Sequence, residues 1–472
     1  MTTRYTGDDS TPERLMSQYY DLHRGSTIFR TLRIKTANRI GVLARVLAVV
    51  AEHGASLGDI RTVSIAPLSR IRDIDMGFTD ATEIERTVDA IQATGEAEVL
   101  EVRDEVLDLH AGGKLIVQSR YPIKGEADLG RVYTPGVGEV ARRIAADPSL
   151  AEHYTTKANT VAIVSDGTSV LGLGAIGPLA AMPVLEGKAA LLSQLVGVFG
   201  IPLVTSSPDP ARIIDAVSLV APTFGLIQLE DIAAPACFTI EEELVARGVP
   251  VFHDDQHGTA AVVLAGLITA SRLVGRELRA CEIGVVGLGA AGNATAKALM
   301  HYTGRPVRGA DLSAPAVERI VAAGGAASSL DEVMATCDVV VAVTGRPGLI
   351  APGMVRPGQI IFALSNPFPE IEVGVALQHG AALATDGRAT NNLLAFPGLC
   401  RGGLDAGVSR FTPAVFRAVA EAIAGLAPEG QLLPPPLDPA IHRAVARAVA
   451  LTAVAEGVAN RHVDEDYMLD AR

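Results

Sequence analysis

The chain has 472 residues, of which 49% are hydrophobic and 20% are charged, and its formal net charge at pH 7 is −13. This length predicts two or three domains with substantial cores, and the acidic balance argues against nucleic acid as a partner. No cationic leader opens the chain, and prolines and glycines interrupt its longest uncharged stretches. We therefore expect a cytoplasmic protein without a membrane span. Cys237, Cys281, Cys337 and Cys400 lack CxxC spacing, which predicts free, buried thiols.

Residues 1–26 are polar and are expected to form an N-terminal arm, and residues 27–104 are expected to form a small module. Alternating apolar residues predict four strands in this module, and helical periodicity predicts two helices. In chain order the elements are Ile28–Lys35, Gly41–His53, Ser56–Ile65, Arg70–Phe78, Thr82–Ala93 and Ala97–Arg103. This βαββαβ order is the ferredoxin-like plan. The loop Asn38–Leu43, with Gly41, resembles that of ACT domains, which implies a regulatory module that binds a small-molecule effector.

Residues 105–270 alternate between strand-like and helical runs, as in α/β domains. Two buried strands end in acidic pairs: Glu230-Asp231 follows Phe224–Leu229, and Asp254-Asp255 follows Val249–Phe252 and His253. Open α/β sheets bind ligands at the carboxyl ends of strands, and carboxylates suit Mg²⁺ or Mn²⁺. The pattern predicts a site for one of these cations. The alternative that Glu230 and Asp231 only cap a helix over Ile240–Arg247 is weaker, because two strands end in acids.

His253 and His257 offer a competing interpretation, because their spacing is that of zinc-protease helices. That spacing places both rings on one face only in a helix, whereas this stretch directly follows a strand. The residue after His253 is also Asp rather than Glu. We expect at least one of the two histidines to pack in the core or to support a metal ligand without binding the metal itself.

Residues 271–435 carry a dinucleotide fingerprint. Two segments match G-x-G-x-x-G, at 172–177 and 287–292, but only the second directly follows a strand and opens a helix. Its cofactor-binding residues are expected to be Gly287, Gly289, Ala290, Ala291 and Gly292, together with Asp311 at the end of the next strand.

The glycines would let the backbone approach a pyrophosphate, and Asp311 would accept hydrogen bonds from the ribose. An acid there repels a 2′-phosphate, so the sequence favours NAD over NADP, although Arg305 and Arg308 keep NADP open. Asn366, at the end of the strand Gln359–Leu364, is either a turn residue before Pro367 or a contact near the nicotinamide. Residues 436–472 are expected to be a helical C-terminal segment.

Several motifs in a consistent order resemble bacterial NAD(P)-dependent malic enzymes over residues 110–405. The matching segments are Tyr133-Thr134-Pro135-Gly136-Val137, Ser165-Asp166-Gly167-Thr168, Gly172-Leu173-Gly174, Glu186-Gly187-Lys188, Leu229-Glu230-Asp231, His253–Thr259, Gly287–Gly292, Ser365-Asn366-Pro367, Asn391-Asn392 and Ala395-Phe396-Pro397-Gly398. The resemblance implies a malic-enzyme substrate and metal domain over 105–270 and a Rossmann-type NAD domain over 271–435. It also implies oxidative decarboxylation of malate to pyruvate and CO₂, and assembly into a homodimer or a higher homo-oligomer.

The same resemblance implies the roles of individual residues. Lys188 would be the general base, Tyr133 the proton donor at C3, and Asp254 would orient the lysine ammonium. Glu230, Asp231 and Asp255 would hold the metal, and Asn366, Asn391 and Asn392 would contact the substrate. A lysine acts as a base only if its pKa falls, which burial and a nearby cation would both favour, whereas Asp254 would have the opposite effect.

Three departures from the family pattern bear on these roles. Ser169 stands where animal-type relatives have an arginine, the nucleotide loop reads Gly-Leu-Gly instead of Gly-Ala-Gly, and the segment Ala384–Thr390 is shortened. Two alternatives stay open: an enzyme that prefers NADP or decarboxylates another 2-hydroxy acid, and an inactive effector-binding protein. Retention of Tyr133, Lys188 and the carboxylates disfavours the inactive protein.

Overall fold

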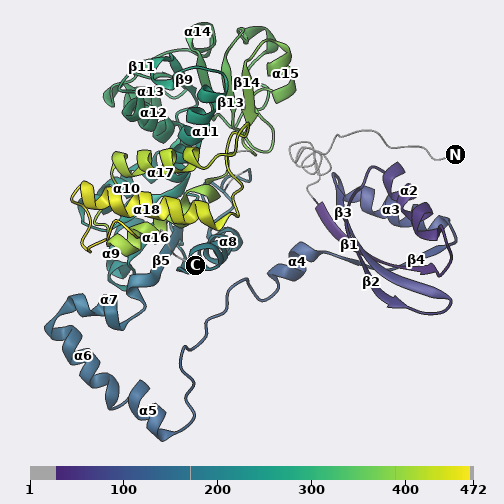
Figure 1. The fold of residues 1–472 in the computed structure, drawn as a ribbon, viewed down its shortest axis with the longest axis horizontal. Coiled ribbons are helices and arrows are strands. Elements are labelled where there is room, and N and C mark those ends of the chain that lie inside the picture. Colours follow the sequence, from purple (N-terminus) through teal and green to yellow (C-terminus); the bar gives the residue numbers. More distant parts are fainter. Residues whose placement is uncertain (1–27, 171, 389, 468–472) are drawn as a thin grey trace. The chain divides into compact units, whose positions relative to one another are not determined.

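The computed structural model describes residues 28–170, 172–388 and 390–467, so the expected arm of residues 1–26 lies outside the described residues. The chain divides into two compact units, Met1–Lys114 and Leu115–Arg472. Each unit has its own hydrophobic core. Figure 1 shows the elements of both.

The first unit is a four-stranded antiparallel sheet covered by two helices. Its elements are β1 (Ile28–Ala37), α2 (Val42–Glu52), β2 (Ser56–Ile65), β3 (Ser69–Phe78), α3 (Ala81–Ala93) and β4 (Ala97–Arg103), followed by the short α4 (Glu105–His110). The strand order β2-β3-β1-β4 confirms the predicted ferredoxin-like plan. Leu32, Ile34 and Ile74 on the sheet pack against Val46 and Val50 of α2, which is why these strands alternate in sequence.

The second unit begins with helices and then forms a four-stranded parallel sheet. The elements are α5 (Glu126–Val132), α6 (Gly136–Ala146), η1 (Pro148–Leu150), α7 (Ala151–Tyr154), η2 (Lys157–Asn159), β5 (Thr160–Ser165), α8 (Pro178–Val196), β6 (Phe199–Val204), α9 (Pro210–Val220), η3 (Ala221–Thr223), β7 (Leu226–Leu229), α10 (Ala236–Ala246) and β8 (Val251–His253). The strand order is β6-β5-β7-β8. Strands β5, β7 and β8 are buried throughout, because helices cover both faces of a parallel sheet. The helix expected over Ile240–Arg247 begins earlier, at Ala236.

A second parallel sheet of six strands follows. Its elements are η4 (Asp254–Gly258), α11 (Thr259–Leu273), η5 (Leu278–Ala280), β9 (Ile283–Val286), α12 (Ala290–Thr303), β10 (Arg308–Ala310), α13 (Ala314–Ala322), β11 (Ala326–Ala327), α14 (Leu330–Thr336), β12 (Val339–Ala342), η6 (Pro352–Met354), β13 (Ile360–Ala363), α15 (Val373–Gln378) and β14 (Leu383–Asp386). The order β11-β10-β9-β12-β13-β14 is that of a Rossmann sheet, which confirms the predicted fold class.

One hydrophobic core joins the two parallel sheets. Its centre is α11, which is buried along most of its length, and the expected domain boundary at residue 270 falls inside this helix. The chain ends with η7 (Asn392–Leu394), α16 (Phe396–Ala406), α17 (Pro413–Gly425) and α18 (Pro439–Ala455), which pack around α8 and α11. The shared core therefore holds the acidic strand ends of one sheet beside the glycine loop of the other.

Candidate active site

Lys188 is a buried cation on α8 and lies among acids. Its Nζ donates a hydrogen bond to Asp254 Oδ2, lies 3.1 Å from Glu230 Oε1, and sits 4.4 Å from the centroid of the Phe396 ring. Burial by itself lowers the pKa of Lys188, but Asp254 and Glu230 outweigh burial and raise this pKa above its usual value. The expectation of a lowered Lys188 pKa is therefore wrong for the protein without a bound cation, because two carboxylates face the ammonium.

A cluster of carboxylates adjoins this lysine. Carboxylate oxygens of Glu230, Asp231 and Asp255 lie within 4.8 Å of one another. Burial raises the pKa of Glu230 to about 7 and that of Asp255 to about 6, since charged acids are costly to bury together. A divalent cation would offset their repulsion, and three carboxylates at strand ends form the hard oxygen set that Mg²⁺ and Mn²⁺ take. The residues present fit the expected cation.

Asp231 is held in an unusual backbone conformation. Its φ is 55°, the only positive φ of a non-glycine residue in the part of the chain that the structure describes. The Asp231 N–H donates to Asp255 Oδ2 at 2.8 Å, and its carbonyl accepts from the Ser169 N–H at 2.9 Å. Aspartate tolerates this left-handed region better than most residues, and such strain concentrates at functional sites.

Glu241 on α10 holds the turn that carries two of the acids, and no sequence motif pointed to it. Its carboxylate accepts from the His253 N–H and from Gln256 Nε2, both at 3.0 Å, and lies 2.9 Å from His257 Nε2. Asp254 and Asp255 lie between these contacts, on η4, a turn of π-helix. Glu241 is therefore a positioning residue for both.

The two histidines pack instead of forming the predicted alternative zinc pair. Burial lowers the pKa of His253 to about 4, so this fully buried ring is neutral. The ring of His257 stacks on Phe416 with centroids 4.3 Å apart. Gly258 is needed because a Cβ there would lie 1.9 Å from Asp254 Oδ1.

The three asparagines have different surroundings. Asn366 follows β13 and is half-buried. Asn392 lies beside η4, since a Cβ on Gly258 would come within 3.6 Å of its Cβ. The exposed Asn391 uses its Oδ1 to accept from the Leu393 N–H at 2.9 Å, which caps η7.

Another buried acid, Glu370, shapes the strand end that carries Asn366. Its carboxylate accepts from the N–H and the hydroxyl of both Thr344 and Ser365, and its side chain is fully buried. These bonds tie the ends of β12 and β13 together. Glu370 lies 26 residues after Thr344 and five residues after Ser365, in the loop beyond β13. Periodicity could therefore not reveal it.

The glycine loop after β9 leaves room for a ligand. A Cβ on Gly287, whose φ is 87°, would lie 2.4 Å from the Val343 carbonyl oxygen, and one on Gly292 would lie 1.8 Å from that of Gly287. A Cβ on Gly289 would meet nothing within 4 Å. Ala290 and Ala291 open α12, whose first N–H groups suit a pyrophosphate. The loop thus fits a dinucleotide.

A cavity of about 500 Å³ lies at this loop, and Asp311 lines it. The Asp311 carboxylate accepts from the Leu288 N–H at 2.6 Å and from the Ser313 N–H at 2.7 Å. Arg305, which kept NADP open, instead pairs with Glu282, and neither it nor Arg308 lines the cavity. The exposed Arg346 is a cationic lining residue that the sequence did not single out.

Tyr133 stands apart from the other candidate residues. It ends α5, its side chain is 65% exposed, and the contacts of Lys188 described above do not include it. Within unit 2, Figure 1 shows α5 separated from α8, which carries Lys188.

Rossmann topology, a glycine loop and a buried lysine among acids define a nucleotide-dependent oxidoreductase. Residues 113–207 match the family model described as malic enzyme, N-terminal domain, and residues 245–346 match the NAD-binding domain of D-isomer-specific 2-hydroxyacid dehydrogenases. A Bacillus subtilis protein named NAD-dependent malic enzyme 1 is 48% identical over 90% of this chain and 99% of its own length. The chain belongs to the malic enzyme family.

One further relative by sequence and one solved structure are also malic enzymes by name. A bifunctional malic/malolactic enzyme of Bacillus subtilis is 40% identical, over 78% of this chain and 97% of its own. The crystal structure of a malic enzyme from Pyrococcus horikoshii superposes with a TM-score of 0.74 and 38% identity, covering 78% of this chain and 94% of that one.

We expect Mn²⁺ or Mg²⁺ to bind the carboxylate cluster and to raise the melting temperature of the wild-type protein. Saturation to about 100 times the dissociation constant would add about 2.7 kcal/mol to the free energy of unfolding. Asp255→Asn should abolish the shift by removing one negative ligand, whereas Glu242→Gln, on an exposed face of the same α10 helix as Glu241, should retain it. Thermal unfolding with and without EDTA makes the measurement. An equal shift in Asp255→Asn and wild type would contradict the assignment.

Asp311→Ser should narrow the preference for NAD over NADP, because serine removes the charge that would repel a 2′-phosphate. Asp338→Ser is the matched control, since Asp338 Oδ2 likewise accepts from a backbone N–H, that of Glu282 at 3.0 Å, but does not line the cavity. The kcat/KM ratio for the two nucleotides measures the effect. A wild-type enzyme whose kcat/KM is higher with NADP than with NAD would refute the predicted preference for NAD.

Proposed function

We propose that this protein catalyses the oxidative decarboxylation of (S)-malate to pyruvate and CO₂, with NAD as hydride acceptor and Mg²⁺ or Mn²⁺ as metal. The observation that carries the proposal is the buried Lys188, bonded to Asp254 and facing Glu230 at the edge of the carboxylate cluster. The dinucleotide loop is close by, because α12 packs against η4. The name of the Bacillus subtilis relative supports the substrate and the nucleotide.

Two residues would move protons in this reaction. Lys188, as a neutral amine, would take the proton of the C2 hydroxyl, and Asp254 would orient it through their hydrogen bond. Tyr133 would return a proton to C3 after CO₂ has left. Bound NAD would accept the hydride from C2.

The remaining site residues would hold the reactants. Glu230, Asp231 and Asp255 would bind the cation, which would polarise the C2 oxygen and compete with Lys188 for the carboxylate of Glu230. The substrate would contact Asn366, Asn392 and Asn391, of which Asn392 lies beside η4. Ser169 donates its N–H to the Asp231 carbonyl, and its uncharged side chain supplies no cation for the substrate carboxylate.

The nucleotide would lie on the glycine loop, with Gly287, Gly289 and Gly292 giving the backbone approach and Ala290 and Ala291 the helix N-terminus. The ribose would contact Asp311. We further propose a cytoplasmic location and a homo-oligomeric state.

The first unit would be the regulatory part. Its cavity of about 300 Å³ is lined by the loop that resembles ACT domains, with Asn38 and Gly41, and by Arg70 and Arg72. Arginines beside exposed backbone suit a small effector with a carboxylate. We propose such an effector for this cavity.

We expect the wild-type protein to form NADH from malate in the presence of Mn²⁺ and to lose this activity in EDTA. Lys188→Ala and Tyr133→Phe should each lower kcat by about 10²–10⁴-fold, because each removes one proton-transfer group. Tyr133→Phe should spare the reduction of a keto acid that needs no enol protonation, whereas Lys188→Ala should impair it too. Tyr121→Phe, at another exposed tyrosine, is the control. Absence of NADH formation by wild type would refute the proposed function.

For the effector, calorimetric titration of the full-length enzyme with amino acids and central carboxylates should reveal a ligand that binds. The same ligand should change the affinity for malate, measured by kinetics as KM, by about 5- to 150-fold. Gly41→Ala should weaken binding, because Gly41 lines the cavity at a φ of 87°. Gly54→Ala carries a similar strain at φ 77° outside the cavity and should leave binding intact. No binding heat for any ligand would leave the unit without a sensory role.

A further inference from the structure

A cavity of about 540 Å³ in unit 2 adjoins η4, the turn that carries Asp254 and Asp255. Its walls come mainly from α10, α11, α12 and α17, together with Gln256 and His257 of η4, and we call it the helical cavity. Among the described residues, none that the proposed function assigns to malate, the cation or the nucleotide lines it. Its volume is typical of sites for small organic molecules. The helical cavity is therefore separate from the proposed active site and has room for a different ligand.

The walls of the helical cavity are mainly apolar and rich in aromatic rings. Three of the lining residues are phenylalanines: Phe238, Phe411 and Phe416. The Phe416 ring stacks on that of His257, and its centroid lies 5.9 Å from that of Phe411. A further ring packs favourably against such surfaces. The walls therefore suit a ligand that carries an aromatic ring.

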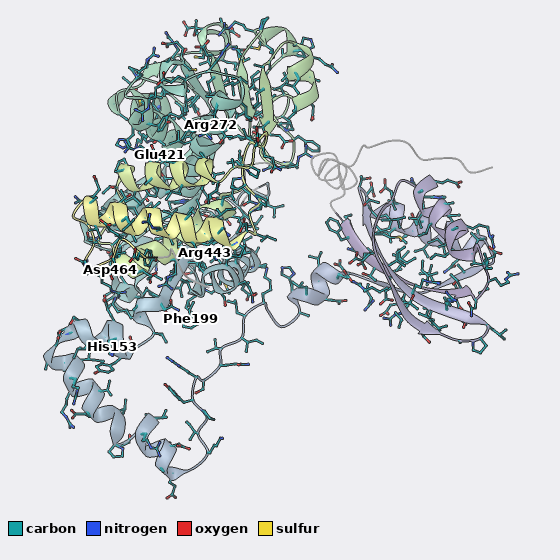
Figure 2. All side chains as sticks on the ribbon, viewed as in Figure 1. His153, Phe199, Arg272, Glu421, Arg443 and Asp464 are labelled. Carbon is teal, nitrogen blue, oxygen red and sulfur yellow. The ribbon has the colours of Figure 1, made fainter. Side chains whose placement is uncertain are left out.

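Cationic side chains lie beside these aromatic walls. Lys297 on α12 lines the cavity, is exposed, and has no hydrogen-bond or ion-pair partner among the described residues. Arg417 on α17 lines it too, and its Nε lies 3.6 Å from Oε1 of Glu421, which Figure 2 labels; this distance is too long for a hydrogen bond. The exposed acid of the lining is Glu242. Two cations and one exposed acid favour a ligand with a single negative charge over a polyphosphate.

Asn293 on α12 adds an unsatisfied amide to the lining. It is 1% exposed, and neither its Oδ1 nor its Nδ2 has a hydrogen-bond partner among the described residues. By contrast, the amide of Gln256, which lines the same cavity, donates from its Nε2 to Glu241 at 3.0 Å. Buried amides in folded proteins almost always have a partner. A polar group on a bound ligand would supply the partner that Asn293 lacks.

The helical cavity also touches the residues that hold η4 in place. Glu241 and His257 line it, and Glu241 accepts from the His253 N–H at 3.0 Å. Asp255 lies between the two histidines in sequence, and its Oδ2 accepts from the Asp231 N–H at 2.8 Å. A ligand packed against Glu241 and His257 would favour this arrangement of the turn over others. Occupation of the cavity would then act on the carboxylate cluster.

We propose that the helical cavity binds an aromatic carboxylate, with the ring against Phe411 and Phe416 and the carboxylate at Lys297. We propose further that the bound carboxylate tightens the binding of Mn²⁺ to Glu230, Asp231 and Asp255. The coupling rests on the cation site of the proposed function, whereas the binding of the aromatic carboxylate does not. By linkage, bound Mn²⁺ tightens the binding of the carboxylate by the same factor.

Calorimetric titration of the full-length protein with 2-naphthoate tests the binding. This compound has two fused rings and one carboxylate, but no hydroxyl or keto group that could stand in for that of malate. Lys297→Ala should raise its dissociation constant by about 10-fold, because a charge-assisted contact is lost, whereas Lys297→Arg keeps the charge and should bind nearly as well as wild type. Arg272→Ala removes an exposed cation of α11, labelled in Figure 2, that does not line the cavity, and should leave binding unchanged.

The neutral 2-naphthalenemethanol is the matched ligand, since it has the same rings without the charge. It should bind more weakly than 2-naphthoate to wild type, and Lys297→Ala should not change its affinity. Absence of binding heat with 2-naphthoate, or the same dissociation constant for wild type and Lys297→Ala, would overturn the site. Lys297 is exposed, so its replacement leaves the core intact.

Calorimetric titration with Mn²⁺, in the presence and absence of saturating 2-naphthoate, tests the coupling. The dissociation constant of Mn²⁺ should fall by about 5-fold or more in wild type when 2-naphthoate is bound. In Lys297→Ala, at a 2-naphthoate concentration that leaves the variant largely unoccupied, it should not change. An unchanged Mn²⁺ affinity in wild type with 2-naphthoate bound would overturn the coupling. Failure of Mn²⁺ to bind at all would overturn the proposed cation site, and with it the coupling, while the titration with 2-naphthoate alone still decides whether the cavity is a binding site.

Discussion

The burial of the Lys188 ammonium is the constraint on which the rest of the active site depends. A buried charge is tolerable only with partners at hydrogen-bond distance, and Asp254 and Glu230 provide them. These partners need supports of their own. Glu241 ties down the turn behind Asp254, and Gly258 must lack a Cβ so that the Asp254 carboxylate fits. The buried ammonium thus dictates four residues in three places: Asp254 and Gly258 on η4, Glu230 after β7, and Glu241 on α10.

A second constraint is close backbone approach at the nucleotide loop. Gly287 and Gly292 are packed against carbonyl oxygens so tightly that no side chain would fit, which brings α12 against its strand. Because α12 also packs on η4, the same helix relates the nucleotide loop to the acids. The core around α11 joins both sheets and keeps this relation fixed. Lys188 and the nucleotide loop can therefore face one ligand although they belong to different sheets.

From the sequence alone, the class of fold and most of the candidate site could be predicted, because local patterns encode them. Alternation encodes the βαββαβ unit, a strand before G-x-G-x-x-G encodes the nucleotide loop, and acidic pairs after apolar strands encode the carboxylate cluster. Only the tertiary structure decided the rest. Glu241 accepts from the His253 N–H and Glu370 from the Thr344 N–H, 12 and 26 residues away in sequence, and periodicity carries no sign of such contacts. The pKa of Lys188 rises instead of falling because its nearest acid is 66 residues away in sequence but in contact in space. The position of Tyr133 at the end of α5 depends on how the helices before β5 are attached to the rest of the unit. Contacts far along the chain, such as that of Arg461 with Glu152 on α7, hold them there.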